Sequence, residues 1–174
     1  MKTLEDQLSN YAAYHRDPRN IATHFVGIPM IVLAVIVLLS RPAVTVSGLT
    51  ISPALIASVM AGVYYLRLSR PMGLLMAALL ALGVVFGAWA ATLSTPAWLA
   101  LGVVGFVVGW VFQFVGHFWE GRKPAFVDDL MGLIIGPLFV VAEACFGMGL
   151  FGAVEREVTA RVGAVRRRGV VRAG

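Results

Sequence analysis

The sequence has 174 residues, of which 59% are hydrophobic and 13% are charged, and its mean hydropathy is +0.86. A soluble domain normally carries about a quarter charged residues, so this composition excludes an ordinary soluble protein and indicates an all-α integral membrane protein. The formal net charge is +5. Most of it comes from the six arginines that follow Ala153, and the nearly neutral remainder argues against nucleic-acid binding.

The first twenty residues are polar. They lack the basic start, apolar middle and small-residue cleavage site of a secretory signal, so we expect the N-terminus to be retained. Leu4, Leu8, Tyr11 and Tyr14 fall on one face of a helix, and Pro18 interrupts the pattern. The pattern predicts a short interfacial helix followed by a turn.

Four hydrophobic segments follow, each close to the roughly 20 residues that cross about 30 Å of hydrocarbon. They span residues 21–39, 51–68, 73–93 and 97–119, with a loop at residues 40–50. The sequence therefore predicts a polytopic helical bundle with four transmembrane helices. Gly102, Gly105 and Gly109 in the fourth segment are small residues that let helices approach closely.

A fifth apolar segment, residues 130–152, contains the pair Gly136-Pro137. The Arg and Lys residues of the loops place the N-terminus in the cytoplasm, so a complete fifth crossing would put the arginine-rich tail outside. We expect a broken or re-entrant segment that bends at Gly136-Pro137 and returns, with a complete crossing as the alternative. The predicted organisation is one membrane-embedded catalytic domain over residues 1–152 and a basic cytoplasmic tail over residues 153–174. The membrane would be a bacterial inner membrane or the endoplasmic reticulum.

This topology brings all three histidines of the sequence to the cytoplasmic membrane face. His15 precedes the first segment, His24 lies at its inner end, and His117 lies at the inner end of the fourth segment. Imidazole is the commonest side-chain ligand for iron, copper and zinc, and three imidazoles suffice for one metal ion with open positions. Pro18 allows the chain to fold back between His15 and His24. The alternative for each histidine alone is a helix-end residue hydrogen-bonded to the backbone.

Further polar residues are expected near this site. Gln113, His117 and Glu120 are spaced i, i+4 and i+7, so they share a helix face. Glu120 would be a metal ligand, a carboxylate that orients a ligand, or an ion-pair partner of Arg122.

Two more polar residues accompany the first and fifth segments. Asn20 shares a helix face with His24. Glu143 lies inside the fifth segment, where a carboxylate needs a partner or must be neutral, and we expect it to accept a proton from a histidine or from Gln113. Asp128 and Asp129 fit loop and helix-cap positions better than ligand positions.

The sequence contains neither Gly-x-Ser-x-Gly nor His-Glu-x-x-His, so the motifs of serine hydrolases and zincins are missing. It does contain a set of residues in a characteristic order: Tyr14-His15, Asn20, His24, Gly27, Pro29, Gln113, Gly116-His117, Glu120, Arg122, Pro124-Ala125, Pro137, Phe139 and Glu143. In these residues the chain resembles the small membrane family that includes the fungal endoplasmic-reticulum 2-hydroxy fatty acid dioxygenase.

The resemblance implies an Fe(II)-dependent dioxygenase of fatty acid α-oxidation. Such an enzyme uses O₂ to cleave the C1–C2 bond of a 2-hydroxy fatty acid and leaves an acid one carbon shorter. The implied metal ligands are His15, His24 and His117, with Glu120 as a fourth ligand or an orienting residue. The other implied site residues are Asn20, Gln113 and Glu143, which would orient the imidazoles, and Arg122 or Arg16, which would meet the substrate carboxylate.

Two other classes of function stay open at this point. One is a non-catalytic transporter or proton relay in which His117, Glu120 and Glu143 pass protons. The other is a zinc-dependent lipid hydrolase that uses the same ligands. For the dioxygenase, the expected partners are a 2-hydroxy fatty acid, O₂ and membrane lipid, with homo-oligomerisation left open and no nucleic acid.

Overall fold

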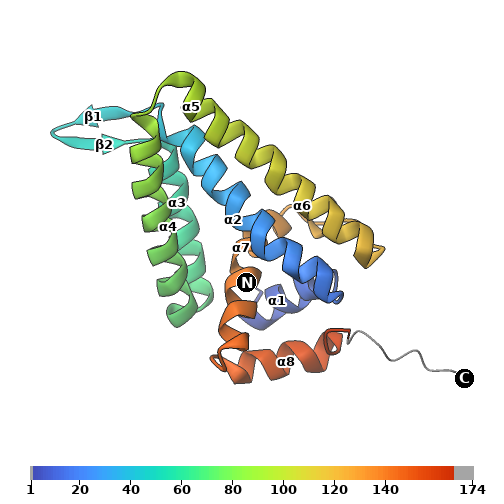
Figure 1. Cartoon of the computed structure of the whole chain (residues 1–174). Coiled ribbons are helices and arrows are strands. Elements are labelled where there is room, and N and C mark those ends of the chain that lie inside the picture. Colours follow the sequence, from blue (N-terminus) through green and yellow to red (C-terminus); the bar gives the residue numbers. More distant parts are fainter. Residues whose placement is uncertain (1, 167–174) are drawn as a thin grey trace, which may run out of the picture. The chain divides into compact units, whose positions relative to one another are not determined.

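The computed structural model describes residues 2–166, and its elements are mainly helices (Figure 1). The chain divides into two compact units. Unit 1 comprises Met1–Phe25 and Phe112–Gly174, and unit 2 comprises Val26–Val111. The predicted all-α class is confirmed. The division into a domain at residues 1–152 and a tail stays a prediction, and residues 167–174 of that tail lie outside the described part.

The helices are α1 (Leu4–Ala12), α2 (Pro18–Ser40), α3 (Pro53–Leu68), α4 (Arg70–Ala91), α5 (Thr95–Leu99), α6 (Gly105–Glu120), α7 (Gly132–Gly147) and α8 (Gly152–Val162). A π-helical turn at Ala100–Val104 joins α5 to α6, and a 3₁₀ turn lies at Ala125–Val127. The expected loop at residues 40–50 instead contains most of an antiparallel hairpin, in which β1 (Val44–Val46) pairs with β2 (Leu49–Ile51). Sequence reasoning missed this hairpin.

The described chain has three helices that are long and apolar enough to cross a membrane: Pro18–Ser40, Arg70–Ala91 and Thr95–Glu120. The bent pair of α7 and α8 would make a fourth. The number of long spans therefore differs from the prediction, because α3 has only 16 residues. Ile51 belongs to β2, and the Ser52 hydroxyl accepts a hydrogen bond from the Leu55 N–H and caps α3 at its first turn.

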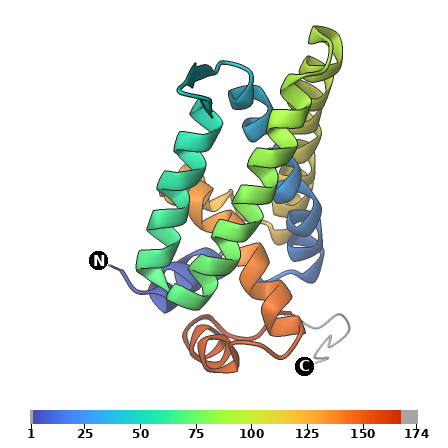
Figure 2. The same cartoon turned by 90° about the vertical axis from the view of Figure 1, so that its left-hand side faces the viewer.

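The fifth apolar segment is broken, but not at the predicted place. α7 continues through Pro137 to Gly147, and the chain bends by 113° before α8 begins (Figure 2). Gly149 and Phe151 have φ angles of 76° and 56°, in the left-handed region that ends helices, whereas a proline removes only one helical hydrogen bond. The predicted bend at Gly136-Pro137 is therefore wrong.

Unit 2 is held together by close helix approaches at small residues. α3 and α4 lie side by side, joined at Ser69 (Figure 1). On the other side of the unit, a methyl group at Gly102 would collide with the Leu38 side chain, and one at Gly109 would meet the Gly27 carbonyl oxygen at 2.9 Å. This confirms the predicted packing role of glycines in the fourth segment.

Unit 1 contains α1, the first turns of α2, the end of α6, and α7 and α8. α1 begins with a capping box, in which Thr3 and Asp6 each bind the other's backbone N–H. It packs against α7 and α8, and an ion pair of 2.7 Å between Arg161 and Asp6 ties α8 to it. The predicted N-terminal helix is confirmed, and its interfacial position stays a prediction.

Candidate metal centre

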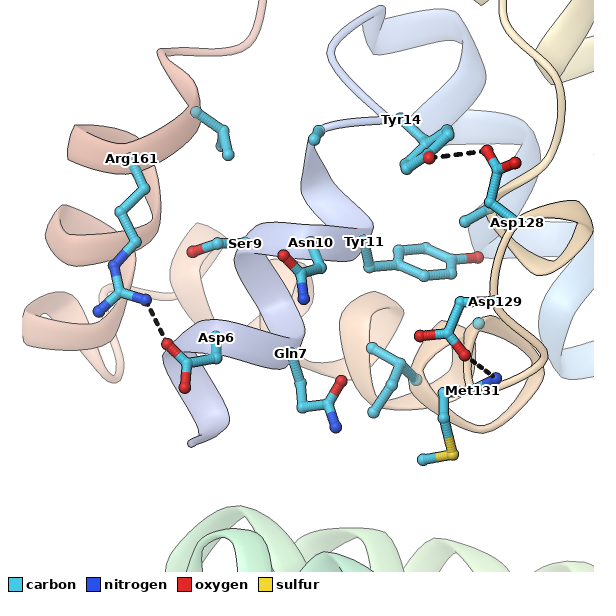
Figure 3. A pocket seen from close by; sticks show the side chains of 15 residues that line it. Asp6, Gln7, Ser9, Asn10, Tyr11, Tyr14, Asp128, Asp129, Met131 and Arg161 are labelled. Carbon is cyan, nitrogen blue, oxygen red and sulfur yellow. Dashed lines mark hydrogen bonds and ion pairs between the residues drawn. The ribbon is translucent and has the colours of Figure 1, made fainter. Parts of the chain in front are cut away.

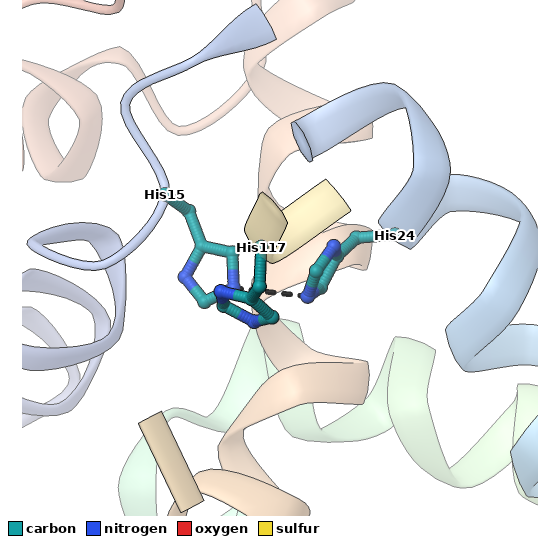
Figure 4. Close-up of side chains that lie close together, drawn as sticks. All are labelled: His15, His24 and His117. Carbon is teal, nitrogen blue, oxygen red and sulfur yellow. Dashed lines mark hydrogen bonds between the residues drawn. The ribbon is translucent and has the colours of Figure 1, made fainter. Parts of the chain in front are cut away.

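The three histidines of the sequence meet inside unit 1 (Figure 4). His15 lies in the turn after α1, His24 in the second turn of α2 and His117 in the last turn of α6. All three are buried, and one ring nitrogen from each lies within 4.8 Å of the others. The convergence expected from the topology is thus present.

The hydrogen bonds of His15 and His24 define which nitrogens are free. His15 Nδ1 donates to the Tyr11 carbonyl at 2.7 Å, and His24 Nδ1 donates to the Asn20 carbonyl at 2.9 Å, each four residues earlier. A carbonyl oxygen accepts only, so Nδ1 carries the proton of the neutral ring and Nε2 presents a lone pair. This is the usual second hydrogen bond of a metal-binding histidine.

The free nitrogens fit a metal ion. The Nε2 atoms of His15 and His24 lie 2.9 Å apart, so two lone pairs face each other, which is favourable only with a cation or a proton between them. Two nitrogens that each bind one ion at about 2.1 Å have a separation of this order. His117 Nδ1 is buried without a hydrogen-bond partner. Three neutral imidazoles are a donor set suited to iron, copper or zinc.

Burial also favours the neutral form needed for ligation. Desolvation, followed by the neighbouring His24 ring, keeps the pKa of His15 well below its usual value. Burial of His15 thus favours the neutral ring, whose Nε2 atom can bind a metal.

An aromatic shell fixes the His15 ring. Tyr11 stacks on it with ring centroids 4.2 Å apart and planes 5° from parallel, and the buried Phe139 of α7 lies 5.4 Å from His15 and 5.0 Å from Tyr11. Sequence reasoning placed Tyr11 only on the apolar face of the first helix. The signal that could have found it is the spacing of four residues to His15, which puts its carbonyl and its ring beside the imidazole.

Glu120 binds the start of α2. Its Oε2 atom accepts hydrogen bonds from the backbone N–H groups of Arg16 (3.0 Å) and Asp17 (2.7 Å) and from Asn20 Nδ2 (3.1 Å). Its Oε1 atom forms an ion pair of 3.3 Å with Arg166. A carboxylate at a helix N-terminus satisfies free N–H groups and the helix dipole. These contacts favour the orienting role among the predicted alternatives.

Arg122 is not the partner of Glu120. Its Nη1 donates to the Ala13 carbonyl at 2.8 Å, and its exposed guanidinium lies over the Tyr14 ring. The alternative of a Glu120–Arg122 ion pair is therefore wrong, and Arg122 instead holds the turn that leads to His15.

The remaining predicted residues differ in how closely they touch the histidines. Asn20 is fully buried. Its backbone carbonyl orients His24, and its side-chain Nδ2 donates to Glu120 and to the Tyr14 backbone carbonyl. Gln113 lies one turn before His117, and its Nε2 atom is buried without a partner. Glu143 is half-buried on α7 and interacts electrostatically with Arg16. The expected hydrogen bond from Gln113 to Glu143 is absent, because the Gln113 Nε2 atom has no partner.

Asp128 and Asp129 lie in the loop before α7, as predicted, where Asp128 is the C-cap of the 3₁₀ turn and Met131, not Asp129, is the N-cap of α7. Tyr14 Oη donates to Asp128 at 2.8 Å, and Asp129 accepts from the Met131 N–H at 2.9 Å. Both line a cavity of about 430 Å³ that Tyr11 also lines (Figure 3). The same Tyr11 ring stacks on His15, so Tyr11 borders both the cavity and the metal centre.

The fold and the centre define a class: an all-α chain with apolar helices long enough to cross a membrane and a buried group of three histidines able to hold a metal ion. A family model described as 2-hydroxy-palmitic acid dioxygenase Mpo1-like matches residues 1–148. The chain is 34% identical over 149 residues to 2-hydroxy-palmitic acid dioxygenase MPO1 of Saccharomyces cerevisiae. The aligned residues cover 84% of this chain and 82% of the relative. The chain therefore belongs to the Mpo1-like family, as its motifs predicted. No solved structure matches it.

Proposed function

We propose that this protein is an Fe(II)-dependent dioxygenase of fatty acid α-oxidation. It would use one O₂ to cleave the C1–C2 bond of a 2-hydroxy fatty acid, which gives an acid one carbon shorter while C1 leaves as CO₂ and the remaining oxygen atom as water. The observation that carries the proposal is the buried group of three histidines in a chain of the Mpo1-like family. The name of the yeast relative specifies 2-hydroxy-palmitic acid as that enzyme's substrate.

His15, His24 and His117 would hold the iron. When bound, Fe²⁺ supplies an O₂-reactive centre that a 2-hydroxy acid can chelate through its carboxylate and hydroxyl oxygens. The protein's part is to present unprotonated nitrogens in fixed directions. The carbonyls of Tyr11 and Asn20 do so for two of the rings.

Four polar residues would position these ligands. Glu120 holds the backbone of residues 16 and 17 and the Asn20 amide, and through them the turn that carries His15 and the helix that carries His24. Asn20, Gln113 and Glu143 would complete the polar surroundings of the imidazoles, and Gln113 Nε2 is a buried donor free to take an acceptor. Arg122 would belong to the basic rim that attracts an anionic substrate.

The substrate would reach the centre from the membrane. Each CH₂ group that an acyl chain buries is worth about 0.8 kcal/mol, so the fatty acid tail belongs among the apolar helices with its polar end at the histidines. The arginines among residues 1–20 and after residue 153 support a position of the centre on the cytoplasmic face by the positive-inside rule. A homo-oligomer is compatible with this arrangement.

Elemental analysis and oxygen uptake test the proposal. Protein purified anaerobically should contain one iron per chain and consume O₂ with 2-hydroxypalmitate, giving pentadecanoate by mass spectrometry, while palmitate without the hydroxyl group should be inert. Zinc without O₂ uptake would support the hydrolase instead. A protein without metal would support a proton relay. Either result would contradict the dioxygenase.

A further inference from the structure

The guanidinium of Arg16 is bound to the backbone of His15 and has one nitrogen without a partner. Arg16 follows His15 directly, is only 9% exposed, and donates from Nε to the His15 carbonyl at 2.9 Å. Its Nη1 donates to the Gly163 carbonyl at 2.7 Å. Its Nη2 is buried and has no hydrogen-bond partner. A buried charged donor without an acceptor is costly, so this nitrogen is suited to binding an anion.

Arg16 differs in this respect from the other arginines near it. Arg19 is held by both carboxylate oxygens of Asp17, at 3.0 and 2.7 Å, and Arg166 pairs with Glu120. Within residues 2–166, Arg16 is the one arginine that is buried, and it has no carboxylate within 4.0 Å. An arginine in this state is a candidate for binding a carboxylate with a charge-assisted hydrogen bond.

The acidic groups around Arg16 do not pair with its Nη2 atom. Glu120 and Glu143 both act on its charge. Glu120 is already occupied by backbone N–H groups and by Arg166, and Glu143 is half-buried and outside ion-pair distance. An iron ion held by the three histidines would add two positive charges beside Arg16, which favours an anion there.

A short segment after α8 holds Arg16 in place. We call residues 163–166 the C-terminal clamp. Within it the Gly163 carbonyl accepts from Arg16 Nη1, and the Arg166 N–H donates to the Arg16 carbonyl at 2.8 Å. The clamp and α8 both lie beyond residue 148, where the match to the family model ends. This chain therefore supports the neighbourhood of its metal centre with residues outside the matched part.

We infer that Arg16 binds the carboxylate of the fatty acid through Nη2, and that the C-terminal clamp positions Arg16 for it. The inference rests on the proposed function for the identity of the acid. It assigns substrate anchoring to Arg16 rather than to the exposed Arg122, and it makes residues 163–166 a positioning element of the site.

Binding of a matched pair of ligands tests the inference. The affinities of the full-length protein, as purified in detergent, for 2-hydroxyhexadecanoate and 2-hydroxyhexadecanamide are measured by tryptophan fluorescence. The wild-type protein should bind the acid more tightly than the amide. Arg16→Gln should lower the affinity for the acid by about 10- to 100-fold, because a charge-assisted hydrogen bond is lost, and should change the affinity for the amide by less than about twofold. The comparison with the variant cancels the contribution of the metal, which is present in both proteins.

Three further proteins separate binding from folding. Arg16→Lys should keep part of the preference for the acid, since lysine keeps the positive charge but lacks the planar guanidinium with its several N–H donors. A chain that ends at Val162 keeps α8 but lacks the clamp, and its acid affinity should fall by about 3- to 10-fold, which is less than for Arg16→Gln. Arg19→Gln, which removes a guanidinium already paired with Asp17, should keep the wild-type preference.

The outcomes are distinct from those of the proposed function. The inference is overturned if Arg16→Gln leaves the ratio of acid affinity to amide affinity unchanged, or lowers both affinities equally, even if the enzyme consumes O₂. Should Arg16→Gln fail to fold, a wild-type preference in both Arg16→Lys and the shortened chain overturns it. If the protein takes up no O₂ but its binding of the acid depends on Arg16, the result contradicts the proposed dioxygenase function and supports carboxylate binding by Arg16.

Discussion

Units 1 and 2 of this protein bury different kinds of side chain. All but three of the buried polar and charged residues described belong to unit 1, and the exceptions, Ser40, Ser52 and Ser58, are serines of unit 2. No Asp, Glu or His occurs between residues 26 and 111, so every acidic group and every imidazole of the sequence lies in unit 1. Unit 2 instead packs through glycines against apolar side chains.

The difference shows how a small membrane protein separates chemistry from packing. In unit 2, Ser40 bonds a carbonyl of its own helix and Ser52 caps its own helix, so each is satisfied locally. In unit 1 the polar groups bond across elements, as Glu120 does for the start of α2, and several buried atoms, among them Arg16 Nη2 and Gln113 Nε2, are left without a partner. They gather where helices end, because free backbone N–H groups are found there. We therefore expect substitutions in unit 1 to affect the metal and those in unit 2 to affect stability alone.

The largest effect is expected from a ligand. His24→Ala should remove the bound metal and lower O₂ consumption with 2-hydroxypalmitate by about 10³-fold or more, because a mononuclear site needs all three ligands. Elemental analysis and an oxygen electrode measure both quantities. Ser58→Ala, a buried polar substitution in unit 2, should keep metal and activity. If His24→Ala retained the metal, the metal site would lie elsewhere, and the assignment of metal binding to unit 1 would be wrong.

A smaller effect is expected from Glu120. Glu120→Gln should weaken metal binding by about 10- to 100-fold without abolishing it, as is usual for residues that orient a ligand. Competition with a chelator of known affinity gives the value. Loss of the metal as complete as in His24→Ala would show that Glu120 is itself a ligand.

Two glycines of α6 offer a matched pair across the units. A methyl group at Gly116 would collide with the side chains of Thr23 and Asn20, whereas one at Gly105 would make an ordinary contact of 3.5 Å with Ala34. Gly116→Ala should lower the free energy of unfolding by about 1–3 kcal/mol and weaken metal binding through Asn20. Gly105→Ala should be neutral or stabilising by up to about 1 kcal/mol, since alanine favours the helix. Chemical denaturation in detergent compares them, and equal losses would contradict the expectation.

The smallest effect concerns pH. The Arg19 side chain, by hydrogen bonding, lowers the pKa of Asp17 to about 2, from an ordinary value of 3.8. The charged Asp17 therefore stabilises the folded state above pH 3.8, and this contribution is lost as the pH falls toward 2. Because Arg19 is partly exposed, we expect less than about 1 kcal/mol. The difference in unfolding free energy between the wild type and Asp17→Asn should shrink on acidification. If this difference in unfolding free energy grew on acidification, the predicted stabilising effect of the charged Asp17 would be wrong.

Much of the centre was predictable from the sequence. Hydropathy located the long helices, loop charge brought His15, His24 and His117 to one face, and the family motifs suggested their chemistry. The i, i+4 rule placed Asn20 with His24 and Gln113 with His117. These inferences succeed because they depend on composition and on spacing within one helix, which a sequence states directly.

Tertiary structure alone decided how the residues are connected. It paired Glu120 with residues about a hundred positions earlier, stacked Tyr11 on His15, and brought the C-terminal clamp to Arg16. It also moved the bend from Gly136-Pro137 to the turn before α8. Spacing tells which side chains share a face of one helix, but a hydrogen-bond partner on another element depends on how the elements pack. That packing is set by many small contacts at once, and no local pattern contains it.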